Sequence, residues 1–271
     1  MKYSFIIIMT ILYFCTNISA AENNTFMFIE TDMTKKQKLI TTNAIGVGLV
    51  TAWGIAKWDY FKTSPNAENE GWFAQNTKEG GADKLGHFHA SWTLSHLFSD
   101  TYKKWGYSHD KGILLGSLSS FTIMGWMEIG DSFSEYGFSH EDFIMNTLGC
   151  VSAYITETNP SLSKRIDFRA EYWPMLKKGD VFTDYENLKY LMAIKLDGFK
   201  NLKPDFLNYF EIHLGYYAKG YEDDSENERN IFVGIGLNMP KIFKDFSFEK
   251  ISRAANFIQI PFTRISYDKK V

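Results

Sequence analysis

The chain has 271 residues, of which 17% are aromatic, and a formal net charge of −3 at pH 7. This length allows one domain with an appendage or two small domains, and the aromatic content excludes a largely disordered protein. The nearly balanced charge lacks the basic footprint of a nucleic-acid-binding protein, so we expect no nucleic-acid partner.

The N-terminus has the pattern of a secretory signal peptide. Lys2 precedes an uncharged, apolar run, and small residues up to Ala21 lead into a polar stretch. The run is too short to cross a bilayer comfortably. We therefore predict a signal peptide at residues 1–21 and export to the periplasm or a membrane-associated place in the cell envelope. Cys15 raises the alternative of a lipoprotein, although Phe14 stands where a lipobox carries a small residue.

Four apolar segments predict a small helical bundle. Glycines in the first segment would let a neighbouring backbone approach closely, and Asn159-Pro160 ends the last one. The lengths of these segments fit either a transmembrane bundle or the buried core of a soluble protein, and periodicity does not separate the two. The segments run over residues 39–58, 83–104, 111–130 and 139–158.

Beyond about Arg165 the apolar residues alternate, which predicts strands with one apolar face. Four strands are too few to close an outer-membrane barrel, which needs about eight. The predicted fold is therefore α+β, with about four helices at residues 22–164, in a membrane or not, followed by a small antiparallel sheet at residues 165–271. The four strands are expected at residues 188–196, 210–216, 231–237 and 257–262.

Polar side chains at the ends of the apolar segments are the candidates for a site. Asp83 and His87 lie four residues apart and share a helix face, where a carboxylate can orient an imidazole base or join it in binding a metal. Asp83 is equally well explained as a helix cap, because it follows Gly-Gly-Ala. His89 and His96 fall on the opposite face from His87 and are expected to pack or hydrogen-bond elsewhere.

Glu128 is the strongest single candidate. It lies three residues before Asp131 at the C-terminal end of its helix, where an acidic residue opposes the macrodipole at a cost of about 0.3–1 kcal/mol. It also projects from an apolar stripe, so its carboxylate needs a partner or a raised pKa. The alternative is that the helix ends earlier and both acids are solvated.

The last helix contributes Asp142 and Asn146. Ser139-x-x-Asp142 is a capping-box pattern, which explains Asp142 without a site. Asn146 and Gly149 continue the same face, and an amide beside small residues predicts a close helix contact and an internal polar partner. The candidate catalytic residues are thus His87, Glu128, Asp83, Asp142 and Asn146.

The order Asp83-Lys84-x-x-His87-Phe88, then Glu128-x-x-Asp131, then Ser139-x-x-Asp142-x-x-x-Asn146-x-x-Gly149 resembles the YfiM-like family of predicted periplasmic (lipo)proteins. Downstream motifs, including Tyr172-Trp173-Pro174 and Gly179-Asp180, look like those of longer members, so the resemblance runs to about Leu237. The motif order is also distantly similar to that of VanZ-like membrane proteins, which are linked to glycopeptide tolerance. It departs from them because Asp131 and Glu135 stand near the positions of their usual Gln and Arg. The resemblance implies an envelope location and this architecture, and it carries no established reaction.

Two functions remain open at this point. The first is a non-enzymatic envelope protein with a structural or binding role, whose partner is a membrane or another envelope component and whose polar residues form caps and an interhelical network. The second is a hydrolase or transferase that acts on an envelope lipid or cell-wall precursor through His87, Glu128 and Asp142. No tight ligand motif such as His-Glu-x-x-His is present, so the sequence identifies neither a metal nor a cofactor.

Overall fold

The computed structural model describes residues 25–26, 29–30, 32–173, 184–200, 202–221 and 226–271. The predicted signal peptide, residues 1–21, lies outside them. The chain divides into two compact units, each of which is described by itself. The sheet unit contains Trp72–His89 and Asn159–Val271, and the helical unit contains the described part of Asn17–Gly71 together with Ala90–Thr158. The predicted division after residue 164 stays a prediction.

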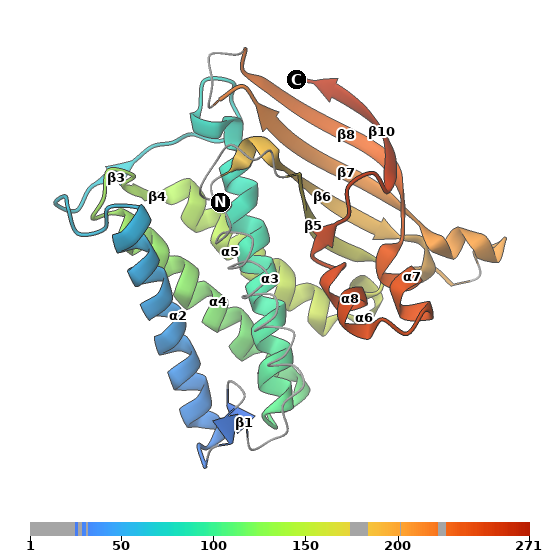
Figure 1. The fold of residues 1–271 in the computed structure, drawn as a ribbon, viewed down its shortest axis with the longest axis horizontal. Coiled ribbons are helices and arrows are strands. Elements are labelled where there is room, and N and C mark those ends of the chain that lie inside the picture. The colour runs from blue at the N-terminus through green and yellow to red at the C-terminus, as the bar shows by residue number, and fades with distance from the viewer. Residues whose placement is uncertain (1–24, 27–28, 31, 174–183, 201, 222–225) are drawn as a thin grey trace. The chain divides into compact units, whose positions relative to one another are not determined.

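Four long helices build the helical unit (Figure 1): α2 (Lys35–Lys57), the part of α3 (Ala82–Lys104) from Ala90 onward, α4 (His109–Asp131) and α5 (His140–Thr158). Thr34 and Gln37 form a capping box at the start of α2, which satisfies backbone N–H groups that have no partner within the helix. Two pairs of short strands accompany these helices. They are β1 (Thr25–Phe26) with β2 (Ile29–Glu30), antiparallel, and β3 (Ala67–Glu68) with β4 (Phe138–Ser139), parallel.

Small residues allow the helices of this unit to approach closely. At Gly116 in α4, an added Cβ would lie 2.5 Å from the backbone nitrogen of Ser99 in α3. At Gly46 in α2, it would lie 2.4 Å from the side chain of Ile123 in α4. The close backbone approach is thus at Gly116, outside the first apolar segment for which it was predicted, whereas Gly46 packs against a side chain.

The helical unit buries polar residues among its apolar core residues and exposes aliphatic ones. On α5, the exposed stripe consists of Ile144, Leu148, Val151 and Ile155, whereas the buried face includes Asp142 and Asn146. On α4, the exposed residues include Leu114 and Leu118, whereas Ser117, Ser119 and Ser120 are buried. Two of the described helices, α2 and α4, are long and apolar enough to cross a membrane.

The sheet unit contains a six-stranded sheet in the order β10-β8-β7-β6-β5-β9 (Figure 1). Its strands are β5 (Ile166–Tyr172), β6 (Leu188–Lys195), β7 (Phe210–Lys219), β8 (Glu228–Leu237), β9 (Ile258–Gln259) and β10 (Arg264–Lys270). Three short helices accompany it, α6 (Pro160–Ser163), α7 (Met239–Asp245) and α8 (Glu249–Ala254), with single 3-10 turns η1 (Lys78–Gly81), η2 (Tyr185–Asn187), η3 (Leu196–Gly198) and η4 (Asp205–Tyr209).

The α+β class is confirmed, and two details of the prediction are wrong. The sheet is mixed, because β9 follows α8 and runs parallel to β5. The described residues also contain seven α-helices, the four long ones and the three short ones of the sheet unit. The sequence prediction missed β5 and β10, because charged residues interrupt their apolar alternation. In β5 these charges point to the buried side, where they have partners.

The first turns of α3 cover one part of the sheet. The ring of Phe88 meets that of Phe168 in β5 edge-on at 4.9 Å, and the ring of His89 lies 6.0 Å from that of Tyr190 in β6. His89 also hydrogen-bonds through Nε2 to the carbonyl of Phe257 at 2.9 Å. The outer face of β5 and β6 therefore has its cover within the sheet unit.

Candidate functional site

The five candidate residues fall into two groups. Glu128, Asp142 and Asn146 belong to the helical unit, whereas Asp83 and His87 belong to the sheet unit. The grouping follows the helices that carry them, because Asp83 and His87 lie on the first turns of α3 and the other three lie on α4 and α5. Whether all five act at one catalytic site stays a prediction.

Glu128 and Asn146 meet inside the helical unit. The Asn146 amide donates from Nδ2 to Oε1 of Glu128 at 2.9 Å, and its Oδ1 accepts from the Ser91 hydroxyl at 2.9 Å. All three side chains are at most 1% exposed. One amide thus joins α3, α4 and α5, which confirms the internal partner predicted for Asn146. Because α4 continues to Asp131 and Glu128 is buried, the alternative of a solvated Glu128 beyond an early helix end is wrong.

Serine residues extend this interhelical network. The hydroxyls of Ser95 and Ser120 both donate to the backbone carbonyl of Ser91 at 2.8 Å. On the other side of the unit, Asn43 of α2 donates to the hydroxyl of Ser119 at 3.0 Å and to that of Tyr102 at 3.2 Å. Each long helix therefore has a buried polar contact with a neighbour, which a mainly apolar protein core does not require.

Ser139 caps the start of α5, as the capping-box pattern indicated. The backbone N–H of Asp142 donates to the hydroxyl of Ser139 at 3.2 Å. The adjacent Glu141 is 1% exposed and was not singled out from the sequence. Its carboxylate accepts from the backbone N–H of Gly71 at 3.0 Å and pairs with His140 at 3.1 Å, so it ties the loop that follows β3 to the start of α5.

A second buried acid, Glu157, was not among the predicted candidates, although the sequence holds the same signal there that singled out Glu128. Like Glu128, it lies in the last turn of its helix, where the macrodipole disfavours an acid. Its carboxylate binds the Ser99 hydroxyl at 2.7 Å, Lys103 at 3.0 Å and Nδ1 of His96 at 3.2 Å. The ammonium group of Lys103 already balances its charge, so this cluster is a poor cation site. His96 hydrogen-bonds away from His87, as expected.

In the sheet unit, Asp83 pairs with the next residue. Its Oδ2 accepts from Nζ of Lys84 at 2.7 Å, and both side chains are buried. The prediction that Asp83 caps the helix is wrong, because α3 begins at Ala82 and Asp83 lies within its first turn. Burial, together with the negative charge of Asp83, raises the pKa of Tyr190, and burial raises the pKa of Tyr216 to about 12, with a smaller contribution from Asp83. His87 follows one turn later on the same face of α3.

The largest polar cluster of the sheet unit escaped the sequence prediction. The buried guanidinium of Arg169 donates to Glu211 at 3.0 Å, to Asp167 at 2.9 Å and to the Gln259 side chain at 3.0 Å. His213 contacts Glu211 at 2.7 Å, and Lys195 binds Asp167 at 2.7 Å. The alternation of charged and apolar residues in Asp167-Phe168-Arg169-Ala170-Glu171 was the signal that could have revealed it. The cluster joins β5, β6, β7 and β9 and has the composition of a structural ion-pair network.

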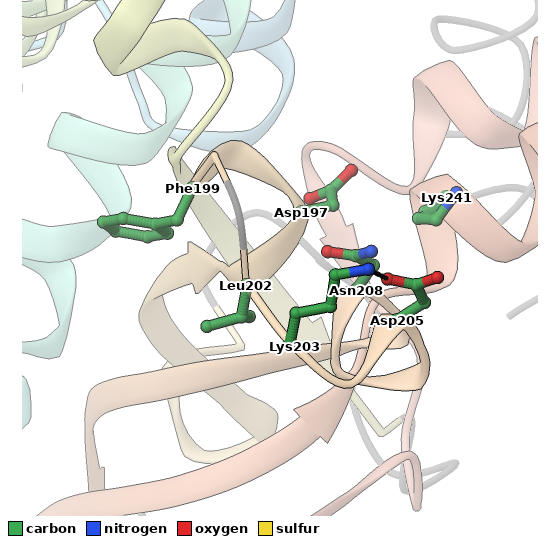
Figure 2. Close-up of a pocket in the computed structure, with 7 residues that line it drawn as sticks. All are labelled: Asp197, Phe199, Leu202, Lys203, Asp205, Asn208 and Lys241. Atoms are coloured by element: carbon green, nitrogen blue, oxygen red, sulfur yellow. Dashed lines mark ion pairs between the residues drawn. The ribbon is translucent and has the colours of Figure 1, made fainter.

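An open hollow of about 380 Å³ lies beside η3 and η4 (Figure 2). Asp197 accepts a hydrogen bond from Asn238 at 2.8 Å, and burial raises its pKa. Lys203 and Asp205 form an exposed ion pair at 3.6 Å. None of the five candidate residues lines the hollow, and it brings together no catalytic arrangement. The lining residues are Asp197, Phe199, Leu202, Lys203, Asp205, Asn208 and Lys241.

Residues 69–158 match the model of a family described as "Predicted periplasmic lipoprotein (DUF2279)". This confirms the resemblance over the segment that carries all five candidate residues. The downstream part of the resemblance, from residue 159 to about Leu237, stays a prediction. No curated protein and no solved structure matches the chain.

Proposed function

We propose, from the premise that residues 69–158 belong to this family of predicted periplasmic lipoproteins, that the chain is a cell-envelope protein whose helical unit is embedded in a membrane. The family description agrees with export and an envelope location. In this proposal the role is structural or binding rather than enzymatic, and the immediate partner is the lipid bilayer.

The observation that carries the proposal is the inverted polarity of α5. Its exposed stripe is aliphatic, from Ile144 to Ile155, and its opposite face buries Asp142 and Asn146. In water a surface helix turns its apolar stripe toward the core, because burial of apolar area stabilises the fold. In a bilayer the solvent is itself apolar, so aliphatic residues face outward and polar residues pair within the bundle.

The same environment explains the polar network. Glu128, Asn146 and Ser91 satisfy one another between helices, and interhelical hydrogen bonds in a membrane contribute about 0.6–2 kcal/mol each. Close packing at Gly116 is the other feature that holds transmembrane helices together when water supplies no hydrophobic driving force. Glu128 and Asn146 then specify how the helices fit together.

The test measures lipid contact along α5 in the full chain after signal removal. Single cysteines replace Leu148, Val151 and, as control, the exposed Thr158 at the helix end, with the buried Cys150 changed to alanine. An environment-sensitive fluorophore is attached, and the protein is reconstituted in phosphatidylethanolamine and phosphatidylglycerol vesicles that contain acyl-chain-brominated lipid. We expect strong quenching at positions 148 and 151 and weak quenching at 158. Equal and weak quenching at all three would refute membrane embedding.

The non-enzymatic role has a separate test. The purified chain and a Glu128→Gln variant are incubated with envelope lipid extract and with lipid-linked cell-wall precursor, and the products are identified by mass spectrometry. We expect no product from either protein. A product formed by the parent chain and lost in Glu128→Gln would favour the hydrolase or transferase alternative.

A further inference from the structure

The outer face of strands β7, β8 and β10 is aliphatic and uncovered. The antiparallel register aligns two rows across these strands, Ile212 with Ile235 and Ile265, and Leu214 with Val233 and Tyr267. All six side chains are exposed, from 38% for Ile212 to 85% for Ile265. We call these six residues, five aliphatic and one tyrosine, the aliphatic face. Within the described part of the sheet unit, no helix lies over it, unlike the outer face of β5 and β6.

The other side of the same sheet is buried and combines charged with apolar residues. It contains the Arg169 cluster, and the hydrophobic core cluster found among the described residues consists of only Leu191, Ala193 and Phe232. The inward rings lie directly on backbone, because an added Cβ at Gly236 would lie 2.2 Å from the His213 ring. The sheet thus places its charges inside and its aliphatic side chains outside.

The two edge strands of the sheet are consecutive in the chain. β9 hydrogen-bonds to β5 at one edge, β10 hydrogen-bonds to β8 at the other, and residues 260–263 connect them (Figure 1). Thr263 supports this connection, because its carbonyl accepts from the backbone N–H of Leu237 and its hydroxyl accepts from Gln259. The chain therefore closes around the side of the sheet that carries the Arg169 cluster. The aliphatic face lies on the opposite, outward side.

This distribution of polarity identifies the chemistry that fits the face. A contiguous apolar patch on a water-soluble protein usually marks a partner site, but in this sheet the opposite side buries the charged Arg169 cluster beside only a small apolar core. A bilayer instead requires that polar groups pair internally while apolar groups face lipid, as they do here. At one end of the face, Tyr216 and Lys269 flank Ile231, and such residues anchor at a membrane surface.

We propose that the aliphatic face of β7, β8 and β10 inserts among the acyl chains of a phospholipid bilayer. The proposal rests on the proposed membrane location of the protein but adds a second lipid-contacting surface, in the sheet unit. Since the aliphatic face covers three of the six strands, the sheet contacts lipid on one side and does not need to be surrounded by it.

The experiment uses the same full chain, Cys150→Ala background and brominated vesicles. The fluorophore is placed at Ile235→Cys on the face and at Asp205→Cys as control, an exposed polar position of the same unit. Circular dichroism checks that both variants are folded, as we expect for substitutions at exposed positions. We expect loss of most of the emission at position 235 and little change at 205.

Two results would overturn the inference. The first is a label at position 235 that is as accessible to water as the label at position 205. The second is a label at 235 that is shielded from brominated lipid while Ile235→Cys copies cross-link to each other. That second result would identify another copy of the chain as the occupant of the face. The label at Leu148→Cys separates this inference from the proposed function. Quenching at 148 without quenching at 235 overturns only the inference, and the reverse overturns only the embedding of the helical unit.

Discussion

Replacement of Leu148 by arginine tests directly whether α5 faces lipid. Leu148 is the ninth of the 19 residues of α5, a helix of about 28 Å, so it lies near the middle of the helix. Its side chain is 46% exposed and makes no polar contact that the substitution would remove. At the centre of a transmembrane helix, leucine is favourable by about 0.3–0.6 kcal/mol, whereas arginine is unfavourable by about 2.5–3.5 kcal/mol.

Leu148→Arg should therefore destabilise the embedded protein by about 3–4 kcal/mol, reduced to the extent that the arginine reaches the interface. In a water-soluble bundle the same change at a half-exposed position would alter the free energy of unfolding by only about 0.5 kcal/mol in either direction. The two environments thus predict effects that differ severalfold for one substitution.

The assay is unfolding by sodium dodecyl sulfate from lipid bicelles, followed by tryptophan fluorescence. Phe246→Arg is the matched control, because it also places arginine at an exposed apolar position, next to the short helix α7, and should leave the unfolding midpoint unchanged. If Leu148→Arg shifts the midpoint no more than Phe246→Arg does, the argument from inverted polarity fails.

Four further predictions concern the packing and the buried charges, and the first three use the same unfolding assay. Gly116→Ala should destabilise by about 1–3 kcal/mol, because its Cβ would meet the backbone of α3, whereas Gly48→Ala, with no atom within 4 Å, should be neutral or stabilising. Asn146→Leu should cost about 1–3 kcal/mol, because it leaves buried partners on α3 and α4 without its amide; an unchanged midpoint would mean that the network is not structural. Arg169→Met should cost about 3–5 kcal/mol, because it leaves buried carboxylates without their cation, and a neutral result would contradict a structural ion cluster. Burial raises the pKa of Asp197 in the folded state, so the free energy of unfolding should fall as the pH rises from the unfolded-state pKa to the folded-state pKa. The Asp197→Asn variant should not show this fall. The measurement is the melting temperature of both proteins as a function of pH.

Much of the helical unit was predictable from local sequence. Long uncharged segments with Gly and Ser define helices, and Ser139 and Pro160 mark their ends, so the observed bounds of α3, α4 and α5 differ from the predicted ones by at most two residues. The position of Glu128 was informative for the same reason. A local rule, the macrodipole, disfavours an acid there, and the acid proved to be buried with a specific amide partner.

Tertiary structure alone decided which residues meet and which faces remain uncovered. Asn146 needed a partner by its chemistry, but Ser91 lies 55 residues away, and no spacing rule identifies a contact made by folding. Periodicity showed that β7 and β8 have one apolar face without showing on which side it lies. That side depends on the partners of Arg169 and on the connection between β9 and β10, both of which join distant parts of the chain. Sequence therefore determined the long helices, strands β6 to β8 and the resemblance of residues 69–158 to a family of predicted periplasmic lipoproteins, whereas the outward direction of the apolar faces is a property of the folded chain.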